Sequence, residues 1–153
     1  MDVGSNRKYP AGSLSNFTAR EFIFDGVECN SMEGLLQAFK FENINSQQIT
    51  CGLVGFYAKK KGSKRNREWQ RRQTLWWNSV EYDRKGKEYQ YLLDRAFSAM
   101  YDQSSAFQDA LRAAGHKTIF THSIGKRNKK ETVLTESEFC SRLQKLKDER
   151  IVW

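Results

Sequence analysis

The stretch Ser31–Phe41 reads SMEGLLQAFKF, and its pattern decides how the chain folds. Ser31 is a typical helix N-cap, and good helix formers follow it. At about 100° per residue, Glu33, Gln37 and Lys40 project within about 60° of one another, and apolar residues cover most of the remaining surface. A helix that is apolar almost all round is a buried helix. This one therefore carries an acid, an amide and an amine into the interior along one line.

Two interpretations of this polar line are open. Ionisable groups in an interior are costly unless they are paired, so one interpretation is a structural ion pair between Glu33 and Lys40. These residues are about two helical turns apart, which is far for a direct contact. The other interpretation is the wall of an active site, because groups with shifted pKa values gather at such sites.

The same stretch resembles a known family. SMEGLLQAFKF is similar to the T-x-E-H-x-F-Q-A-x-K-F helix of the NADAR (YbiA-like) family. SLSNF at 13–17 and FIFDGVE at 22–28 are similar to the family's opening, and LTESEFCSRLQKLKDE resembles its last helix. The resemblance covers roughly Leu14 to Glu149. It departs from the family at Gly34, where the family has His, at Leu36, where it has an aromatic residue, and at 121–125, where THSIG replaces a Trp-Gly segment.

The resemblance implies an N-glycosidase that hydrolyses the bond between ribose C1 and an exocyclic amine, without a cofactor. Substrate classes in the family are riboflavin-pathway ribosylamino intermediates and ADP-ribose attached to guanine. An exocyclic amine lets the ribose ring open to an imine, which a second amine can displace. Apolar neighbours favour a neutral lysine, so we expect Lys40 to form a Schiff base at C1. We expect Glu33 to shuttle protons. A retaining two-carboxylate glycosidase is the competing mechanism, but its second carboxylate is not evident.

Further residues are expected to bind the substrate. Gln37 lies between the two catalytic candidates and would hold a ribose hydroxyl. In the family, the segment matching 15–17 lines the sugar–phosphate pocket, although a local turn explains this sequence equally well. The two tryptophans suit either base stacking or the core, and the 122–125 loop matches a late family loop that would contact phosphate. The substrate-binding candidates are Gln37, Ser15, Asn16, Phe17, Trp76, Trp77, His122, Ser123 and Gly125.

Positive charge is the second informative feature of the chain. The net charge is +8, which favours a polyanionic partner. Residues 59–73 hold eight Lys or Arg against Glu68 alone. Basic side chains contact phosphates, but a solvated basic face is the alternative. The candidate nucleic-acid-binding residues, called the basic stripe below, are Lys59, Lys60, Lys61, Lys64, Arg65 and Arg67.

Composition limits the remaining classes. A chain of 153 residues fits one domain. There is no apolar run near 18 residues and no secretion signal, so we expect a cytoplasmic protein without a membrane partner. Cys29, Cys51 and Cys140 are scattered and odd in number, which indicates neither a disulfide framework nor a zinc site. With only His116 and His122, a histidine metal site is not expected.

The pattern of elements predicts an α+β fold, a mostly helical single domain with a small N-terminal β-hairpin, of YbiA-like type by resemblance. Residues 1–11 are expected to be loose and 12–153 to form the domain. The hairpin turns at Asp25-Gly26. A helix over 46–61 is expected to turn Leu53, Phe56 and Tyr57 inward. Further helices are predicted at 66–75, 87–101, 105–114 and 135–150, the last with Thr135 and Glu138 as a capping box, and a short strand is predicted at 117–120.

Three functions follow from these expectations. The first is an N-glycosidase that removes ADP-ribose from guanine in nucleic acid, most simply DNA, with ADP-ribose as product and no obligate protein partner. The second is an N-glycosidase of riboflavin-pathway intermediates. The third is an inactive domain that binds ADP-ribose or nucleic acid. The basic stripe favours the first over the second, because a mononucleotide needs no such row of charges.

Overall fold

The computed structural model describes Met1–Trp153, and its first helix begins where the sequence predicts. The Ser31 side chain accepts a hydrogen bond from the Gly34 N–H at 2.9 Å and so caps the helix. In chain order the elements are β1 (Phe22–Phe24), β2 (Val27–Cys29), α1 (Met32–Ala38), α2 (Ile44–Cys51), α3 (Gly55–Ser63), α4 (Asn66–Arg72), β3 (Thr74–Trp77), β4 (Val80–Asp83), α5 (Lys87–Gln103), α6 (Ser105–Ala114) and α7 (Glu136–Arg150). The fold is α+β and mostly helical, which confirms the predicted class.

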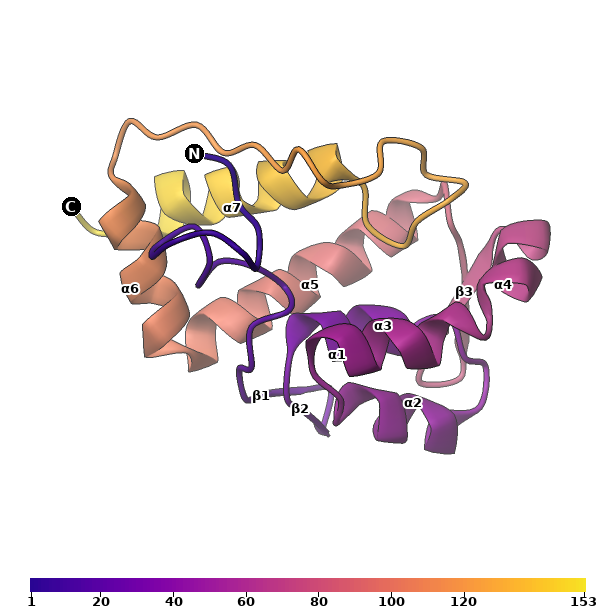
Figure 1. Ribbon diagram of the computed structural model, residues 1–153. Coiled ribbons are helices and arrows are strands. Elements are labelled where there is room, and N and C mark those ends of the chain that lie inside the picture. The colour runs from indigo at the N-terminus through magenta and orange to yellow at the C-terminus, as the bar shows by residue number, and fades with distance from the viewer.

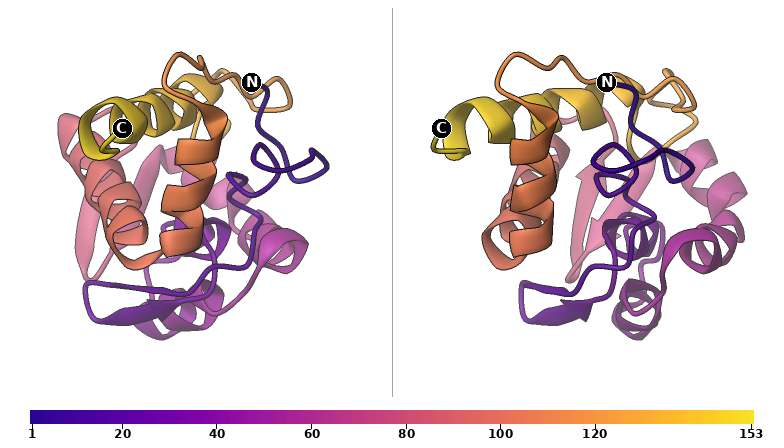
Figure 2. Two further views of the ribbon diagram at one scale, coloured as in Figure 1. Left: turned by 90° about the vertical axis from the view of Figure 1, so that its left-hand side faces the viewer. Right: turned by 60° about the vertical axis from the view of Figure 1, so that its left-hand side comes forward.

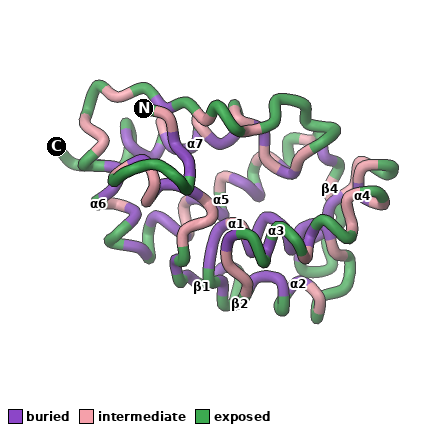
Figure 3. Tube along the Cα trace, in the orientation of Figure 1, coloured by how far each residue is buried: buried purple, intermediate pink, exposed green.

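The helices form an upper and a lower part on either side of α5 (Figure 1). Helix α7 and the segment 115–134 lie above α5, and α1, α2 and α3 lie below it, an arrangement that the rotated views also show (Figure 2). One apolar core joins the parts, and several elements contribute large side chains to it: Trp69 from α4, Trp77 from β3, Tyr89 and Phe97 from α5, and Phe139 from α7. Figure 3 shows that α1 is buried along its length, whereas α3 and α4 carry exposed outer faces. None of the helices is long and apolar enough to cross a membrane.

Helix α1 packs so closely against its neighbours that position 34 must be glycine. A Cβ on Gly34 would lie 2.6 Å from the Leu53 carbonyl oxygen and 2.9 Å from that of Cys51. Backbone atoms cannot yield as a flexible side chain can, so any larger residue would push α1 away from the chain that links α2 to α3. The polar line of α1 is therefore fixed in position by a backbone contact on an adjacent face of the helix.

Two antiparallel hairpins accompany the helices, and only the first was predicted. In β1–β2, Asp25 and Gly26 both have positive φ angles, 48° and 79°, as a two-residue hairpin turn requires. In β3–β4 the corresponding residues are Asn78 and Ser79, at 49° and 68°. Asn-Ser is a weak turn signal without glycine, which is why the pattern did not reveal this hairpin.

The helix predicted over 46–61 is wrong, because the chain forms two helices there. Helix α2 ends at Cys51, and α3 starts at Gly55, whose φ angle of 54° lies in the left-handed region. The break reorients the following turn, so Phe56 and Tyr57 are 65% and 73% exposed instead of inward. The helix predicted to reach Leu75 ends at Arg72.

The N-terminal segment, expected to be loose over 1–11, is instead tied to the segment after α6. The Val3 N–H donates to the Thr121 carbonyl at 2.9 Å, and the Thr121 N–H donates to the Met1 carbonyl at 2.9 Å. This single bridge replaces the strand predicted at 117–120. The Asp2 carboxylate accepts from the Ser123 hydroxyl and N–H at 2.7 and 2.8 Å, and these bonds hold the pKa of Asp2 well below its usual range.

Helix α7 begins with the predicted capping box, and a buried arginine extends it. The Thr135 hydroxyl accepts from the Glu138 N–H, and the Glu138 carboxylate accepts from the Thr135 N–H. Arg84, which is fully buried, makes two bonds to the same carboxylate at 2.7 and 3.1 Å. Its Nε also donates to the Thr132 carbonyl at 2.8 Å, so this cluster fixes the loop that precedes α7.

Candidate active site

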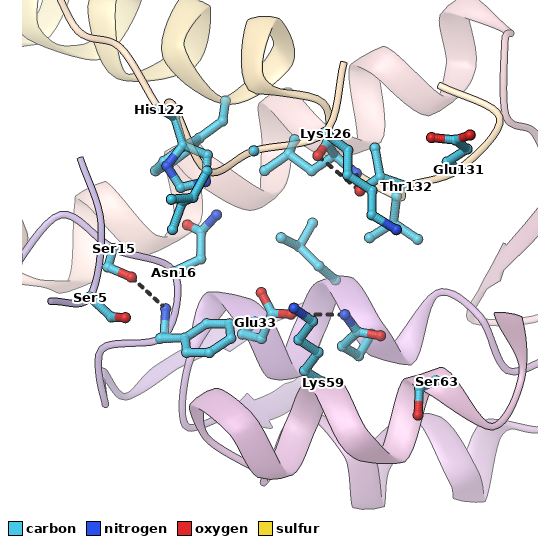
Figure 4. A pocket seen from close by; sticks show the side chains of 18 of the residues that line it. Ser5, Ser15, Asn16, Glu33, Lys59, Ser63, His122, Lys126, Glu131 and Thr132 are labelled. Atoms are coloured by element: carbon cyan, nitrogen blue, oxygen red, sulfur yellow. Dashed lines mark hydrogen bonds between the residues drawn. The ribbon is translucent and has the colours of Figure 1, made fainter. Parts of the chain in front are cut away.

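A cavity of about 250 Å³ opens between the lower helices and the 122–134 loop (Figure 4). Helices α1 and α3 and the start of α4 form its floor, the late loop forms its roof, and residues 15–17 close one side. The cavity brings together most of the predicted site: Glu33, Gln37, Lys40, Ser15, Asn16, Phe17, His122 and Gly125, with Lys59 from the basic stripe.

Lys40 is the least exposed charged group of the cavity, with 6% of its surface accessible. Its Nζ donates to the Asn66 Oδ1 at 2.6 Å, and the Trp69 Nε1 donates to the same oxygen at 3.2 Å. Desolvation lowers the pKa of Lys40 to about 8, although the negative charge of Glu33 acts in the opposite direction. A lysine with such a pKa is neutral for an appreciable part of the time near neutral pH, and a neutral amine is a nucleophile.

Glu33 lies one turn from Gln37 on the same face, and the Gln37 Nε2 donates to the Glu33 Oε1 at 2.8 Å. Burial raises the pKa of the Glu33 carboxyl, against the Gln37 hydrogen bond and the charge of Lys40, which lower it. No Glu33–Lys40 ion pair forms. Both groups are thus shifted toward their neutral forms within one cavity, which suits them to exchange protons with a bound molecule.

Two buried acceptors of the cavity have no hydrogen-bond donor. They are the Asn16 Oδ1 and the Gln37 Oε1. Gln37 is held between α1 and α3, because a Cβ on Gly62 would lie 1.8 Å from its Oε1. Buried polar atoms are nearly always bonded, so these two oxygens are suited to receive hydroxyl donors from a ligand.

The segment 15–17 both forms the local turn and lines the cavity, the two alternatives that the sequence left open. The Ser15 hydroxyl accepts from the Phe17 N–H at 3.1 Å, which is the local turn. The Asn16 carbonyl accepts from the Glu33 N–H at 3.0 Å, so the turn is docked on the first turn of α1. Asn16 accordingly projects between His122 and Glu33 in Figure 4.

The late loop contributes His122 and Gly125 to the cavity, but not Ser123. The His122 Nδ1 donates to the Val3 carbonyl at 2.7 Å, and its ring packs edge-on against Phe139. A Cβ on Gly125 would lie 2.5 Å from the His122 ring, so only glycine lets the loop close here. Ser123 faces outward, where it bonds to Asp2.

Trp76 and Trp77 do not line the cavity, and base stacking by them is not compatible with their burial. They are 3% and 1% exposed. The Trp77 ring stacks on Phe24 at 5.6 Å between centroids, and its Nε1 donates to Asp25 at 2.8 Å. Trp76 lies in β3, and its backbone N–H donates to the Phe39 carbonyl at 2.8 Å. Consecutive residues of a strand point to opposite faces of the sheet. Both tryptophans are nevertheless buried, because both faces of β3 are covered.

Sequence patterns missed three parts of the site. Asn66, the partner of Lys40, starts α4, and nothing in the sequence links these positions. Lys126 and the wall at Thr132–Leu134 come from a loop whose path is set by Arg84 and by the Tyr89 hydroxyl, which donates to the Val133 carbonyl. No three His, Cys, Asp or Glu side chains gather where a metal ion could bind.

The basic stripe follows α3 and the start of α4, and none of its six residues forms an ion pair. Lys59 reaches the cavity, as Figure 4 shows. Lys60, Lys64 and Arg67 are exposed, whereas Lys61 lies over the Phe41 ring at 5.8 Å. The stripe therefore begins at the cavity and continues along the outer surface.

Comparison with known proteins shows that this chain is similar to a family of phage proteins. Residues 8–148 match the family described as "Bacteriophage protein GP30.3". The chain belongs to this family. A relative from Enterobacteria phage T4, described as an uncharacterized 17.1 kDa protein in the Gp30-rIII intergenic region, is 35% identical over 149 residues, which cover 97% of each chain. No solved structure matches the chain.

Membership of the GP30.3 family corrects the earlier expectation of a NADAR (YbiA-like) protein, which is wrong. The departure at position 34 has a structural cause, because the backbone of 50–53 leaves no room there for a histidine side chain. The roles that the resemblance implied for Lys40 and Glu33 lose that support. They now depend on the geometry of the cavity.

Proposed function

We propose that this GP30.3 family member is an N-glycosidase that removes ADP-ribose from guanine in nucleic acid through a Schiff base on Lys40. One observation carries the proposal. A desolvated lysine whose pKa is lowered to about 8 lines the same cavity as a carboxyl whose pKa is raised. Burial thus shifts the lysine toward a neutral nucleophilic amine and the carboxyl toward a protonated acid, and this pair is the combination that imine chemistry needs.

The reaction begins with ring opening. The protonated form of Glu33 gives its proton to the ribose ring oxygen while the C1–O bond breaks, and the lone pair of the exocyclic amine forms a C1=N iminium. The neutral Lys40 Nζ adds to C1. A proton passes from Nζ to the guanine amine through the Glu33 carboxylate, and the C1–guanine bond breaks. Water then adds to C1 and gives a proton to the Glu33 carboxylate, which passes it to Nζ. The C1–Nζ bond breaks, and the hydroxyl proton on C1 returns to Glu33 as the aldehyde forms. The ribose ring then closes, which releases ADP-ribose and restores neutral Lys40 and protonated Glu33.

The remaining cavity groups suit the rest of this substrate. The unpartnered Asn16 Oδ1 and Gln37 Oε1 would accept bonds from the ribose hydroxyls. Lys59 and Lys126, which both line the cavity, would face the diphosphate. The unpaired basic stripe beyond Lys59 favours a substrate within a nucleic-acid chain over a free mononucleotide. We also propose that such an enzyme works in the cytoplasm.

The test is to incubate the protein with DNA carrying ADP-ribosyl-guanine and to measure released ADP-ribose. Borohydride added during turnover should attach the sugar to Lys40, and Lys40→Ala should lose both turnover and labelling. Lys40→Arg is the matched control, because it keeps a cation but no nucleophilic amine, and it should also be inactive. Full activity in Lys40→Ala would exclude the Schiff base. Release of the base only from ribosylamino intermediates of the riboflavin pathway would show that these intermediates, and not modified DNA, are the substrate. Binding of ADP-ribose without turnover would show that the protein is a binding domain and not an enzyme.

A further inference from the structure

The outer face of α3 carries two exposed aromatic rings that have no role inside the protein. Phe56 and Tyr57 are 65% and 73% exposed, and their ring centroids lie 6.4 Å apart at an interplanar angle of 69°. The buried face of the helix is formed by Gly55, Ala58 and Gly62. At about 100° per residue, the opposite face therefore presents the two rings to solvent.

The same outer face carries exposed cations. Lys60 follows Phe56 by one turn, and Lys64 follows Lys60 by another. Neither lysine has an ion-pair partner. Helix α3 thus combines aromatic rings and free positive charges on one surface, which extends about 12 Å from Phe56 to Lys64.

This surface is continuous with the cavity. Lys59 and Ser63, on the flank of the same helix, line the cavity. At the first turn of α3, a Cβ on Gly55 would lie 3.6 Å from the ring of Phe17, which belongs to the cavity wall. A chain held at the cavity can therefore continue over the outer face of α3 without crossing another element.

We propose that the outer face of α3 binds single-stranded nucleic acid, with bases stacked on Phe56 and Tyr57 and phosphates held by Lys60 and Lys64. The charge of the face is complementary to phosphate, and aromatic rings beside cations are the arrangement by which proteins hold unpaired strands. A duplex cannot use these rings, because its base faces already cover one another. The inference rests on the proposed function for the identity of the substrate, and it adds the state of the strand and the surface that orients it.

The test measures binding of an unmodified, fluorescein-labelled DNA oligonucleotide, single-stranded or in a matched duplex, by fluorescence anisotropy. Phe56→Ala and Tyr57→Ala should each weaken single-strand binding by at least about five-fold, the lower end of one lost base stack. Phe56→Trp should retain binding. Tyr91→Ala is the matched control, because Tyr91 is an equally exposed tyrosine on α5, and it should bind as the wild type does.

The salt dependence of binding distinguishes the lysine–phosphate contacts from base stacking on the aromatic rings. The loss caused by Lys60→Gln with Lys64→Gln should fade as salt rises, whereas the loss caused by removing the rings should persist. Equal affinity of the ring variants and the wild type would overturn the inference. So would a wild-type dimer that dissociates on Phe56→Ala, because the rings would then bind a second copy. The unmodified probe carries no ADP-ribose to release, so these binding outcomes are independent of the turnover test for Lys40.

Discussion

Lys40 is placed where its charge is disfavoured but its amine is held in position. Only 6% of its surface is accessible, and Asn66 is its one hydrogen-bond acceptor. The unfolded chain binds the Lys40 proton up to a pH near its ordinary pKa of 10.5, whereas the folded protein releases it near pH 8. Between these values the unfolded state binds more protons, so this group makes the free energy of unfolding rise with pH.

Lys40→Met should therefore stabilise the protein at pH 7. The lowered pKa corresponds to roughly 3 kcal/mol in favour of the variant. Asn66 keeps its bond from the Trp69 Nε1, so no oxygen is left without a donor. The gain should shrink as the pH rises from about 8 to 10.5, and urea unfolding at several pH values measures it. A variant less stable at pH 7 would show that the lysine charge is not penalised.

Glu33→Gln should lower the rate at saturating substrate by roughly 100-fold or more, the range of general acid–base catalysis. The amide keeps the shape of the side chain and can still bond to Gln37, but it cannot carry a proton. Substrate affinity should change little. If binding collapses while the saturated rate holds, Glu33 is a ligand of the ribose and not a proton shuttle.

The close packing of α1 at Gly34 leads to a prediction about stability. Gly34→Ala should destabilise the protein by about 1–3 kcal/mol, because its Cβ would meet three backbone oxygens of residues 50–53. Alanine favours an isolated helix by about 1 kcal/mol, so the packing term must exceed this gain. Gly52→Ala is the matched control, since its nearest contact would lie 3.4 Å away, and it should be close to neutral. Urea unfolding compares the two, and equal stabilities would show that α1 can shift freely.

Local signals predicted those elements whose ends are fixed by nearby residues. Ser31 caps α1, Asp25-Gly26 turns the first hairpin, and Thr135 with Glu138 caps α7. The polar residues of α1 were likewise predicted to share one face, because a helix fixes which side chains lie together, although the sequence left an ion pair and an active-site wall as alternatives. These features depend on residues only a few positions apart.

Long-range contacts determine what the sequence did not predict. The left-handed turn at Gly55 splits one predicted helix and brings Phe56 to the surface. Arg84 sets the path of the loop above the cavity from a distance of 48 residues along the chain. Asn66 lies beside Lys40 because α3 packs on α1 and the start of α4 follows α3. No pattern within a single segment encodes such contacts.

The distribution of charge over the surface predicts how binding responds to salt. Replacing Lys60, Lys64 and Arg67 by glutamine should weaken processing of a modified oligonucleotide far more than that of a modified mononucleotide. Each lost phosphate contact should lower the slope of log affinity against log salt by about 0.7 for a single strand. The reason is that counterion release scales with the phosphates neutralised, whereas the chemistry of the cavity does not depend on it.

The control for this variant removes the same charge elsewhere. Lys85, Lys87 and Lys117 are also exposed and unpaired, and replacing them by glutamine changes the net charge equally. The salt slope should then stay close to that of the wild type. An equal fall for both triple variants would mean that only total charge matters and that the stripe is a solvated surface.

The floor and the roof of the cavity are synthesised at different times during translation. The floor is complete once Asn66 has been made, but the roof starts only at His122. At about 5–20 residues per second, translation of the intervening stretch takes several seconds. During this delay Lys40 and Glu33 face water, in which a lysine is charged and a carboxyl is ionised. Under the proposed mechanism, the nascent chain has no nucleophilic amine until α7 docks, and a chain that stops before that helix should be inactive.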